Sequence, residues 1–178
     1  MLRAILHAYE GDDRSPVSIM RFCNQKLFAA RLDGSFTTAF YATLDTRTGE
    51  LTWARCGHNP PRLRRADGSV VALDCAGALP LGVTDDPPLE QADVVMHPGD
   101  TLVLYTDGIT EAFAPHAPRG SRDMFGTRRL DQALTECSGR PSCVVDSIHS
   151  ALYAHTGVMD RDDDQTLVVV RRSSPDDA

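Results

Sequence analysis

The middle of the chain, from residue 36 to residue 106, is a series of short segments rich in β-branched and aromatic residues. Such residues favour strands, and the glycine, proline and aspartate between the segments favour chain reversal. The Asp67-Gly68 pair is a strong hairpin signal. The sheet is therefore expected to be largely antiparallel. We predict strands over residues 36–44, 51–56, 61–65, 70–73, 92–96, 101–106 and 165–171, with residues 76–88 as a surface loop.

Segments with helical spacing stand on either side of this strand-rich region. Apolar residues recur at helical intervals over residues 1–9 and 15–31, and again over 128–137 and 141–155. Ser15 followed by proline is a typical helix start, because serine caps free amides and proline fits the first turn. Strands and helices that occur in separate runs indicate an α+β fold rather than a doubly wound parallel sheet.

Length and charge limit the classes of protein to which the chain can belong. Its 178 residues fit one domain, which we place at residues 1–172, with residues 173–178 as a flexible tail. A net charge of −7 argues against nucleic-acid binding, because phosphate backbones are bound by clustered lysine and arginine. The short basic run of Arg62, Arg64 and Arg65 is interpreted as one solvated strand face.

Two further observations concern the compartment. No run approaches the roughly 20 apolar residues that span a bilayer. The first residues do not have the organisation of a signal peptide. We therefore predict no membrane contact and a cytoplasmic location. The five cysteines have no CxxC spacing, which favours buried free thiols over disulfides or a zinc site.

Two acidic clusters lie beside predicted strands. Asp107 follows the apolar strand that ends at Thr106, and Asp163 and Asp164 belong to an acidic run just before the last strand. Oxygen ligands at rigid strand ends suit hard divalent cations such as Mg²⁺, and a cation would relieve the repulsion among the carboxylates. An ordinary Asp-Gly turn and a solvated acidic loop remain open as alternatives.

A third feature is the Gly57-His58-Asn59-Pro60-Pro61 segment, which follows a predicted strand. His58 is a candidate general acid or ligand, and a purely structural role in shaping the turn stays open. Neither a Ser-His-Asp elbow nor a phosphate-binding GxxxxGK loop is present, so nucleophilic and P-loop mechanisms lack support.

Taken together, the motifs resemble the PPM-type serine/threonine phosphatases of the SpoIIE and RsbU branch. The residues that carry the resemblance are Phe36-Thr37-Thr38-Ala39-Phe40-Tyr41, Leu44-Asp45, Thr48-Gly49, Gly57-His58-Asn59-Pro60-Pro61, Leu79-Pro80-Leu81-Gly82, Pro98-Gly99-Asp100, Tyr105-Thr106-Asp107-Gly108-Ile109-Thr110-Glu111, Phe125-Gly126 and Asp163-Asp164-Gln165-Thr166.

The resemblance implies a β-sandwich flanked by helices and a site for two Mn²⁺ or Mg²⁺ ions. Asp107 and Asp163 match metal ligands of the family, Asp164 is a secondary ligand, and Gly108 and His58 shape the site. No catalytic residue beyond the metal ligands is implied. The implied substrate is a phosphorylated regulator, such as a STAS-type anti-sigma-factor antagonist, and a homodimer is left open.

The chain also departs from this pattern. Family members carry an Asp-x-Ser-Gly-His-Gly segment upstream, which supplies a bridging metal ligand, and this sequence lacks it. We therefore expect a domain that is incomplete at its N-terminus, weak metal binding and impaired catalysis. A non-catalytic regulatory module that binds a partner is the alternative hypothesis.

Overall fold

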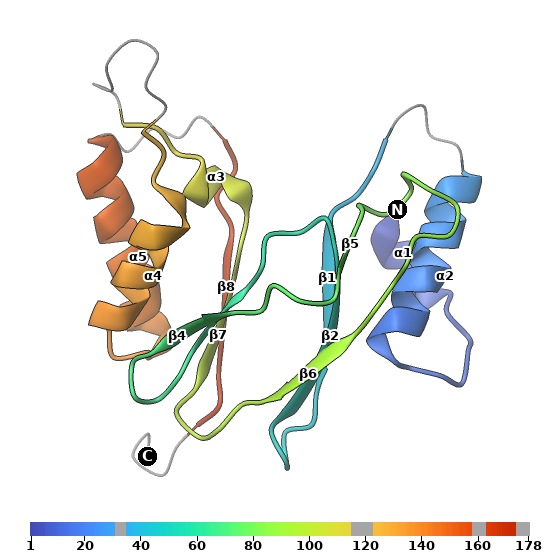
Figure 1. The fold of residues 1–178 in the computed structure, drawn as a ribbon, viewed down its shortest axis with the longest axis horizontal. Coiled ribbons are helices and arrows are strands. Elements are labelled where there is room, and N and C mark those ends of the chain that lie inside the picture. The colour runs from blue at the N-terminus through green and yellow to red at the C-terminus, as the bar shows by residue number, and fades with distance from the viewer. Residues whose placement is uncertain (31–34, 115–122, 158–162, 174–178) are drawn as a thin grey trace. The chain divides into compact units, whose positions relative to one another are not determined.

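The computed structural model describes residues 1–30, 35–114, 123–157 and 163–173. The chain forms two compact units, residues 1–58 with 74–95 and residues 59–73 with 96–178, and each is described by itself. Each unit contains a four-stranded sheet and its own helices (Figure 1). The predicted α+β class is confirmed. Among the described residues, no helix is both long and apolar enough to cross a membrane.

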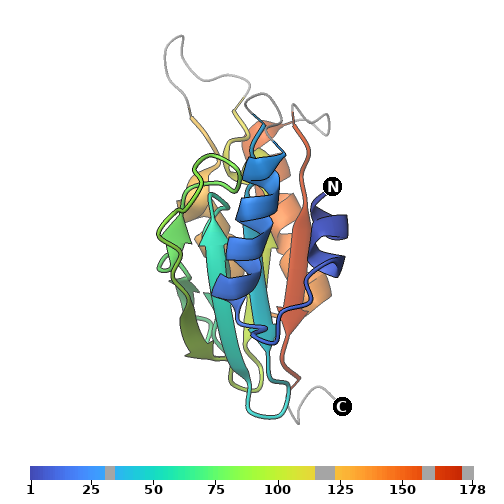
Figure 2. The same ribbon diagram turned by 90° about the vertical axis from the view of Figure 1, so that its right-hand side faces the viewer.

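The first unit is built around strand β2. Its helices are α1 (Leu2–His7) and α2 (Pro16–Ala29), and its strands are β1 (Ala39–Leu44), β2 (Glu50–Cys56), β5 (Gly77–Ala78) and β6 (Ala92–Val95). Strand β2 pairs antiparallel with β1 and β6, and parallel with the two-residue strand β5. Helix α2 lies over this sheet (Figure 2). Their shared core consists of Ile19, Met20, Cys23, Leu27, Ala54, Cys56 and Leu81.

Local chemistry explains the start of α2. The Ser15 hydroxyl accepts a hydrogen bond from the Ser18 amide at 3.4 Å, and Pro16 takes the first helical position. Buried Asn24 then connects the helix to the loop before β6, because its side-chain amide donates to the Thr84 and Asp85 carbonyls at 2.9 and 2.8 Å. Helix α2 and this loop are therefore held together by a side chain that sequence spacing alone does not connect to the loop.

The second unit has strand order β4-β3-β7-β8, antiparallel throughout. Its elements are β3 (Arg62–Arg64), β4 (Val70–Ala72), β7 (Thr101–Tyr105), α3 (Asp107–Thr110), α4 (Gly126–Glu136), α5 (Pro141–Thr156) and β8 (Leu167–Arg171). Helices α4 and α5 pack together and against this sheet. The core of the unit contains Val103, Tyr105, Ile109, Phe125, Leu130, Ala133, Leu134, Cys137, Val144, Ile148 and Leu152.

The Pro98-Gly99-Asp100 turn has a structural role. Buried Asp100 accepts hydrogen bonds from the amides of Ala66 and His97, at 2.9 and 2.8 Å, and from the Arg65 guanidinium at 2.8 Å. These contacts fasten the turn before β7 to the end of β3. Strands β6 and β7 on either side of the turn do not pair with one another, because each belongs to a different sheet.

Three sequence predictions are corrected here. Arg62 and Arg64 do not lie on a solvated face: each is only 6% exposed, and they bond to Asp131 and Leu134 of helix α4. The loop predicted over residues 76–88 contains strand β5. The Asp-Gly pair at residue 107 begins one turn of helix rather than a reversal. These differences arise from tertiary partners, which local spacing does not report.

The prediction of buried free thiols is correct in part. All five cysteines are free, and Cys23, Cys56 and Cys137 are buried, whereas Cys75 is exposed and Cys143 is half-buried. Of the tail predicted over residues 173–178, residues 174–178 lie outside the described residues.

Candidate metal site at the β7–β8 end

Strands β7 and β8 bring the two acidic clusters to the same end of one sheet. Tyr105 pairs with Leu167 at the last register position of β7. The contact continues beyond the strands, because the Thr106 amide donates to the Thr166 carbonyl at 3.2 Å and the Thr166 amide to the Thr106 hydroxyl at 2.9 Å. Asp107 and the residues before Gln165 therefore leave the sheet side by side.

Asp107 is the first residue of α3, and its side chain is exposed. Its carboxylate accepts a hydrogen bond from the Gly108 amide at 3.1 Å, and its backbone carbonyl accepts one from the Glu111 amide at 2.7 Å. The short helix fixes the backbone, and the buried side chain of Ile109 anchors it in the core. A carboxylate is thus presented to solvent from a rigid support.

Gly108 permits a very close approach of the second acidic segment. A Cβ atom at this position would lie 2.5 Å from the carbonyl oxygen of Asp164 and 3.4 Å from the Cβ of Asp163. Only glycine leaves room for that backbone. Gly108 therefore sets the separation between the backbones of the Asp107 and Asp163 segments.

Two side chains that the sequence analysis did not select hold the segment in place. The Gln165 amide donates to the Gly108 carbonyl at 3.0 Å, and the Thr106 hydroxyl donates to the Asp164 carbonyl at 3.0 Å. Both lie within motifs quoted above, at strand ends, but nothing in their spacing distinguishes them from ordinary polar residues. Their role depends on the pairing of β7 with β8.

The two aspartates of the second cluster differ in how they are held. Both are exposed, and the Asp163 carboxylate accepts a hydrogen bond from the Asp164 amide at 2.7 Å. The backbone carbonyl of Asp164 faces Thr106, so this residue contributes to the packing through its main chain. The rest of the acidic run, residues 160–162, lies outside the described residues.

The carboxylate oxygens at this end of the sheet are of the kind that hard divalent cations prefer. Mg²⁺ in proteins is usually bound by one or two carboxylates and keeps several waters, and exposed Asp107 and Asp163 supply such carboxylates on adjacent segments. Within the part of the chain that the structure describes, no group of three or more His, Cys, Asp or Glu side chains is close enough to hold a metal. The residues present therefore fit part of a metal site rather than a closed one.

His58 belongs to the first unit and is described apart from the acidic pair. It is half-buried, and its carbonyl accepts a hydrogen bond from the Arg55 guanidinium at 2.9 Å. Gly57 before it has φ +68°, and a Cβ there would lie 2.5 Å from the Pro80 ring. The described contacts of this segment are those of a tightly packed turn.

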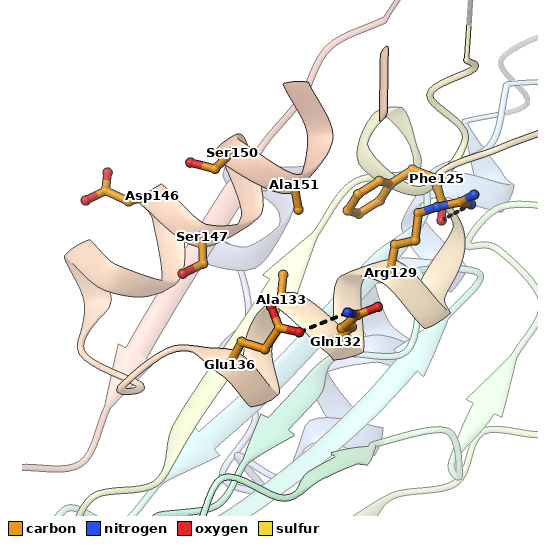
Figure 3. A pocket seen from close by; sticks show the side chains of 9 residues that line it. All are labelled: Phe125, Arg129, Gln132, Ala133, Glu136, Asp146, Ser147, Ser150 and Ala151. Atoms are coloured by element: carbon orange, nitrogen blue, oxygen red, sulfur yellow. Dashed lines mark hydrogen bonds between the residues drawn. The ribbon is translucent and has the colours of Figure 1, made fainter. Parts of the chain in front are cut away.

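A separate pocket of about 670 Å³ lies on helices α4 and α5, and none of the predicted site residues lines it. In Figure 3 the side chains of Gln132 and Glu136 bond to each other, while Arg129 lies beside Phe125. The lining residues are Phe125, Arg129, Gln132, Ala133, Glu136, Asp146, Ser147, Ser150 and Ala151. Its mixed charges do not point to one ligand class.

The α+β fold, with carboxylates at the end of paired strands, agrees with the resemblance to PPM-type phosphatases that the motifs suggest. Comparison with known proteins places it more closely. The family model "Stage II sporulation protein E (SpoIIE)" matches residues 1–173. The chain belongs to the SpoIIE family.

Individual relatives agree with this assignment. The chain is 29% identical over 161 residues to the phosphoserine phosphatase RsbU of Bacillus subtilis. The aligned region covers 88% of this chain and 45% of RsbU. The structure of the RsbU and RsbW domains of Rv1364c from Mycobacterium tuberculosis superposes with a TM-score of 0.74 and 26% identity, covering 98% of this chain and 47% of that one.

A more distant structure, of RsbX in complex with magnesium, has a TM-score of 0.60 at 18% identity and covers 94% of this chain and 69% of that one. It shows the same fold. The chain spans 21% to 45% of the length of curated relatives that it matches.

Proposed function

We propose that this chain forms part of the catalytic domain of a metal-dependent protein serine/threonine phosphatase. The observation that carries the proposal is the meeting of Asp107 and Asp163 across the β7–β8 end, with Gly108 as the spacer. Membership of the SpoIIE family supports it, as does similarity to RsbU, which is named a phosphoserine phosphatase.

In this proposal Asp107 and Asp163 hold a Mn²⁺ or Mg²⁺ ion, with Asp164 as a secondary ligand. When bound, such an ion supplies an activated water for in-line attack on phosphorus and neutralises phosphoryl charge. The chain's own contribution is geometric. Thr106, Gly108 and Gln165 hold the backbones of the two aspartate segments in close contact, which supports the preorganisation that a metal site needs.

The finer assignment of substrate follows from the same similarity. We infer a phosphorylated regulatory protein, of the STAS-type anti-sigma-factor antagonist class, in the cytoplasm. The acidic chain, with a net charge of −7, suits a protein substrate better than a nucleic acid.

The proposal is tested at two levels. Calorimetric titration of Mn²⁺ into the 178-residue chain should show weak binding that Asp107→Asn and Asp163→Asn each reduce at least tenfold, with a smaller effect of Asp164→Asn. Asp146→Asn is the matched control, because Asp146 is an exposed carboxylate on α5 of the same unit. Equal affinities in all variants would overturn the assignment of the ligands.

The second level is activity in the longest natural chain that contains these residues. Mn²⁺-dependent hydrolysis of para-nitrophenyl phosphate should fall at least a hundredfold in Asp107→Asn and stay unchanged in Asp146→Asn. Retained hydrolysis in Asp107→Asn would refute a role for this residue in catalysis.

A second candidate function is a non-catalytic module that binds a phosphoprotein partner. The ligand set favours it, because the described residues offer fewer than three grouped metal-binding side chains. No Mn²⁺ binding, combined with intact partner binding, would support this candidate over the phosphatase.

A further inference from the structure

The turn between α4 and α5 carries a cysteine at each end. Cys137 follows the last residue of α4 and is 5% exposed, whereas Cys143 lies in the first turn of α5 and is half-buried. Neither residue takes part in the proposed metal site. Two free thiols on one short turn therefore require a separate explanation.

The turn is held rigidly from the sheet side. Buried Arg64 donates to the Cys137 carbonyl, and the Thr101 hydroxyl donates to the Gly139 carbonyl at 2.7 Å. Gly139 has φ +77°, a left-handed conformation that favours glycine, and a Cβ there would lie 2.7 Å from the Arg64 guanidinium. These contacts fix the backbone of the turn between Cys137 and Gly139.

The surroundings of Cys143 favour its thiolate. The Ser138 amide donates to its Sγ at 3.3 Å, and the Ser147 hydroxyl lies 4.0 Å away. Hydrogen bonds from the side chain and backbone of Ser138, with a smaller effect of Ser147, lower the pKa of Cys143. A position in the first turn of a helix acts in the same direction. The thiolate is the nucleophilic form of cysteine, so Cys143 is the more reactive of the two.

Cys137 is suited to be the second partner. Its Sγ donates to the Leu134 carbonyl at 3.3 Å and is shielded from solvent, which keeps it from direct attack by an oxidant. The amide of Ser138, the residue directly after Cys137, donates to the Cys143 Sγ at 3.3 Å, so the Cys143 sulfur lies beside the backbone of Cys137. Cys143 also packs against the core cluster that contains Cys137.

We propose that Cys143 and Cys137 form a reversible oxidation site, in which Cys143 reacts with a peroxide and Cys137 resolves the product as a disulfide. In the first step the Cys143 sulfur attacks one peroxide oxygen, the O–O bond breaks, and a sulfenic acid and one water form. In the second step the Cys137 sulfur attacks the sulfenic sulfur, the S–O bond breaks, and a second water leaves with the Cys137 proton. Two thiols are oxidised and one peroxide is reduced.

Oxidation of the two cysteines can be measured by peptide mass analysis in the full chain. After hydrogen peroxide treatment and alkylation of remaining thiols, trypsin should release residues 130–161 as one peptide, because Arg140 precedes a proline. Cys137 and Cys143 are its only cysteines, so an internal disulfide appears as a peptide that carries no alkyl group and is two hydrogen atoms lighter than the free dithiol. A thiol reductant should restore both alkylation sites. Exposed Cys75 is the internal control, because it is the only cysteine in its tryptic peptide.

The variants distinguish the roles of the two thiols. In Cys143→Ser the peptide should keep an alkylatable Cys137, and in Cys137→Ser the Cys143 sulfenic acid should accumulate and be trapped by dimedone. Cys143→Ser changes a half-buried helix position and should leave the far-ultraviolet circular dichroism unchanged, which shows that the variant folds.

Two results would overturn the proposal. One is a wild-type peptide that keeps both alkylatable thiols while Cys75 is oxidised. The other is an equal rate of disulfide formation in the native chain and in the chain unfolded by urea, because the fold would then contribute nothing to the reaction.

Discussion

Replacement of Gly108 by alanine tests how the candidate metal site is spaced. The added Cβ would lie 2.5 Å from the Asp164 carbonyl oxygen, whereas real Cβ atoms essentially never come within 3.0 Å of another atom. The obstructing atom belongs to the backbone, so the Asp163-Asp164 segment has to move by at least half an ångström. The hydrogen bonds from Thr106 and Gln165 hold this segment and would be strained or lost.

We expect Gly108→Ala to destabilise the chain, although helix propensity alone would predict that alanine stabilises it. Glycine to alanine in the interior of an exposed helix is favourable by about 1 kcal/mol. Overpacking of a close contact costs about 1–3 kcal/mol, and each hydrogen bond that is lost removes about 1 kcal/mol. We therefore expect Gly108→Ala to lower the free energy of unfolding by about 1–3 kcal/mol, as measured by urea denaturation.

The same variant should weaken Mn²⁺ binding, because it moves Asp163 relative to Asp107. Loss of supporting contacts around metal ligands typically reduces affinity by about 10- to 100-fold. Gly126→Ala is the control for metal affinity: no atom lies within 4 Å of the new Cβ, so it should leave Mn²⁺ binding unchanged, although the φ of +72° makes alanine strained there and should lower stability. A Gly108→Ala chain that is as stable as wild type and binds Mn²⁺ equally well would refute the reasoning.

Three further predictions concern the two cores. Arg64→Met should lower the free energy of unfolding by about 3 kcal/mol in urea denaturation, because it leaves the Leu134 and Cys137 carbonyls without their charged donor. Arg47→Met, at an exposed ion pair, should stay within about 0.5 kcal/mol of wild type, and equal losses would contradict the burial argument. Asn24→Ala should cost about 2–3 kcal/mol, because it removes three hydrogen bonds to the loop of residues 82–85, and urea denaturation of this variant measures the loss. Burial raises the pKa of the Cys23 and Cys56 thiols from 9.0 to about 11, so their contribution to stability is complete below pH 9 and is lost as the pH rises towards 11. A Cys23→Ala/Cys56→Ala chain should lose less stability than wild type over this interval, and parallel pH curves would contradict the prediction.

Much of the secondary structure could be predicted from the sequence, because it depends on neighbours along the chain. Ser15 and Pro16 start α2 through contacts within one turn, and Asp67-Gly68 closes the β3–β4 hairpin with Gly68 at φ +93°. The two acidic segments could likewise be selected as candidate ligands from their position beside apolar strands. Each of these predictions rests on interactions over a few residues.

What only the tertiary structure decided is which distant segments meet. Nothing in the local pattern shows that Gly108 contacts a backbone 56 positions later, or that Gln165 bonds to the Gly108 carbonyl. The same holds for Arg64, whose partners on α4 and just after it lie about 70 residues away and turn an expected solvated residue into a buried one. A guanidinium or a glycine can be placed by sequence on a strand or at its end, but its role depends on the atoms opposite it, and these come from the packing of the whole unit.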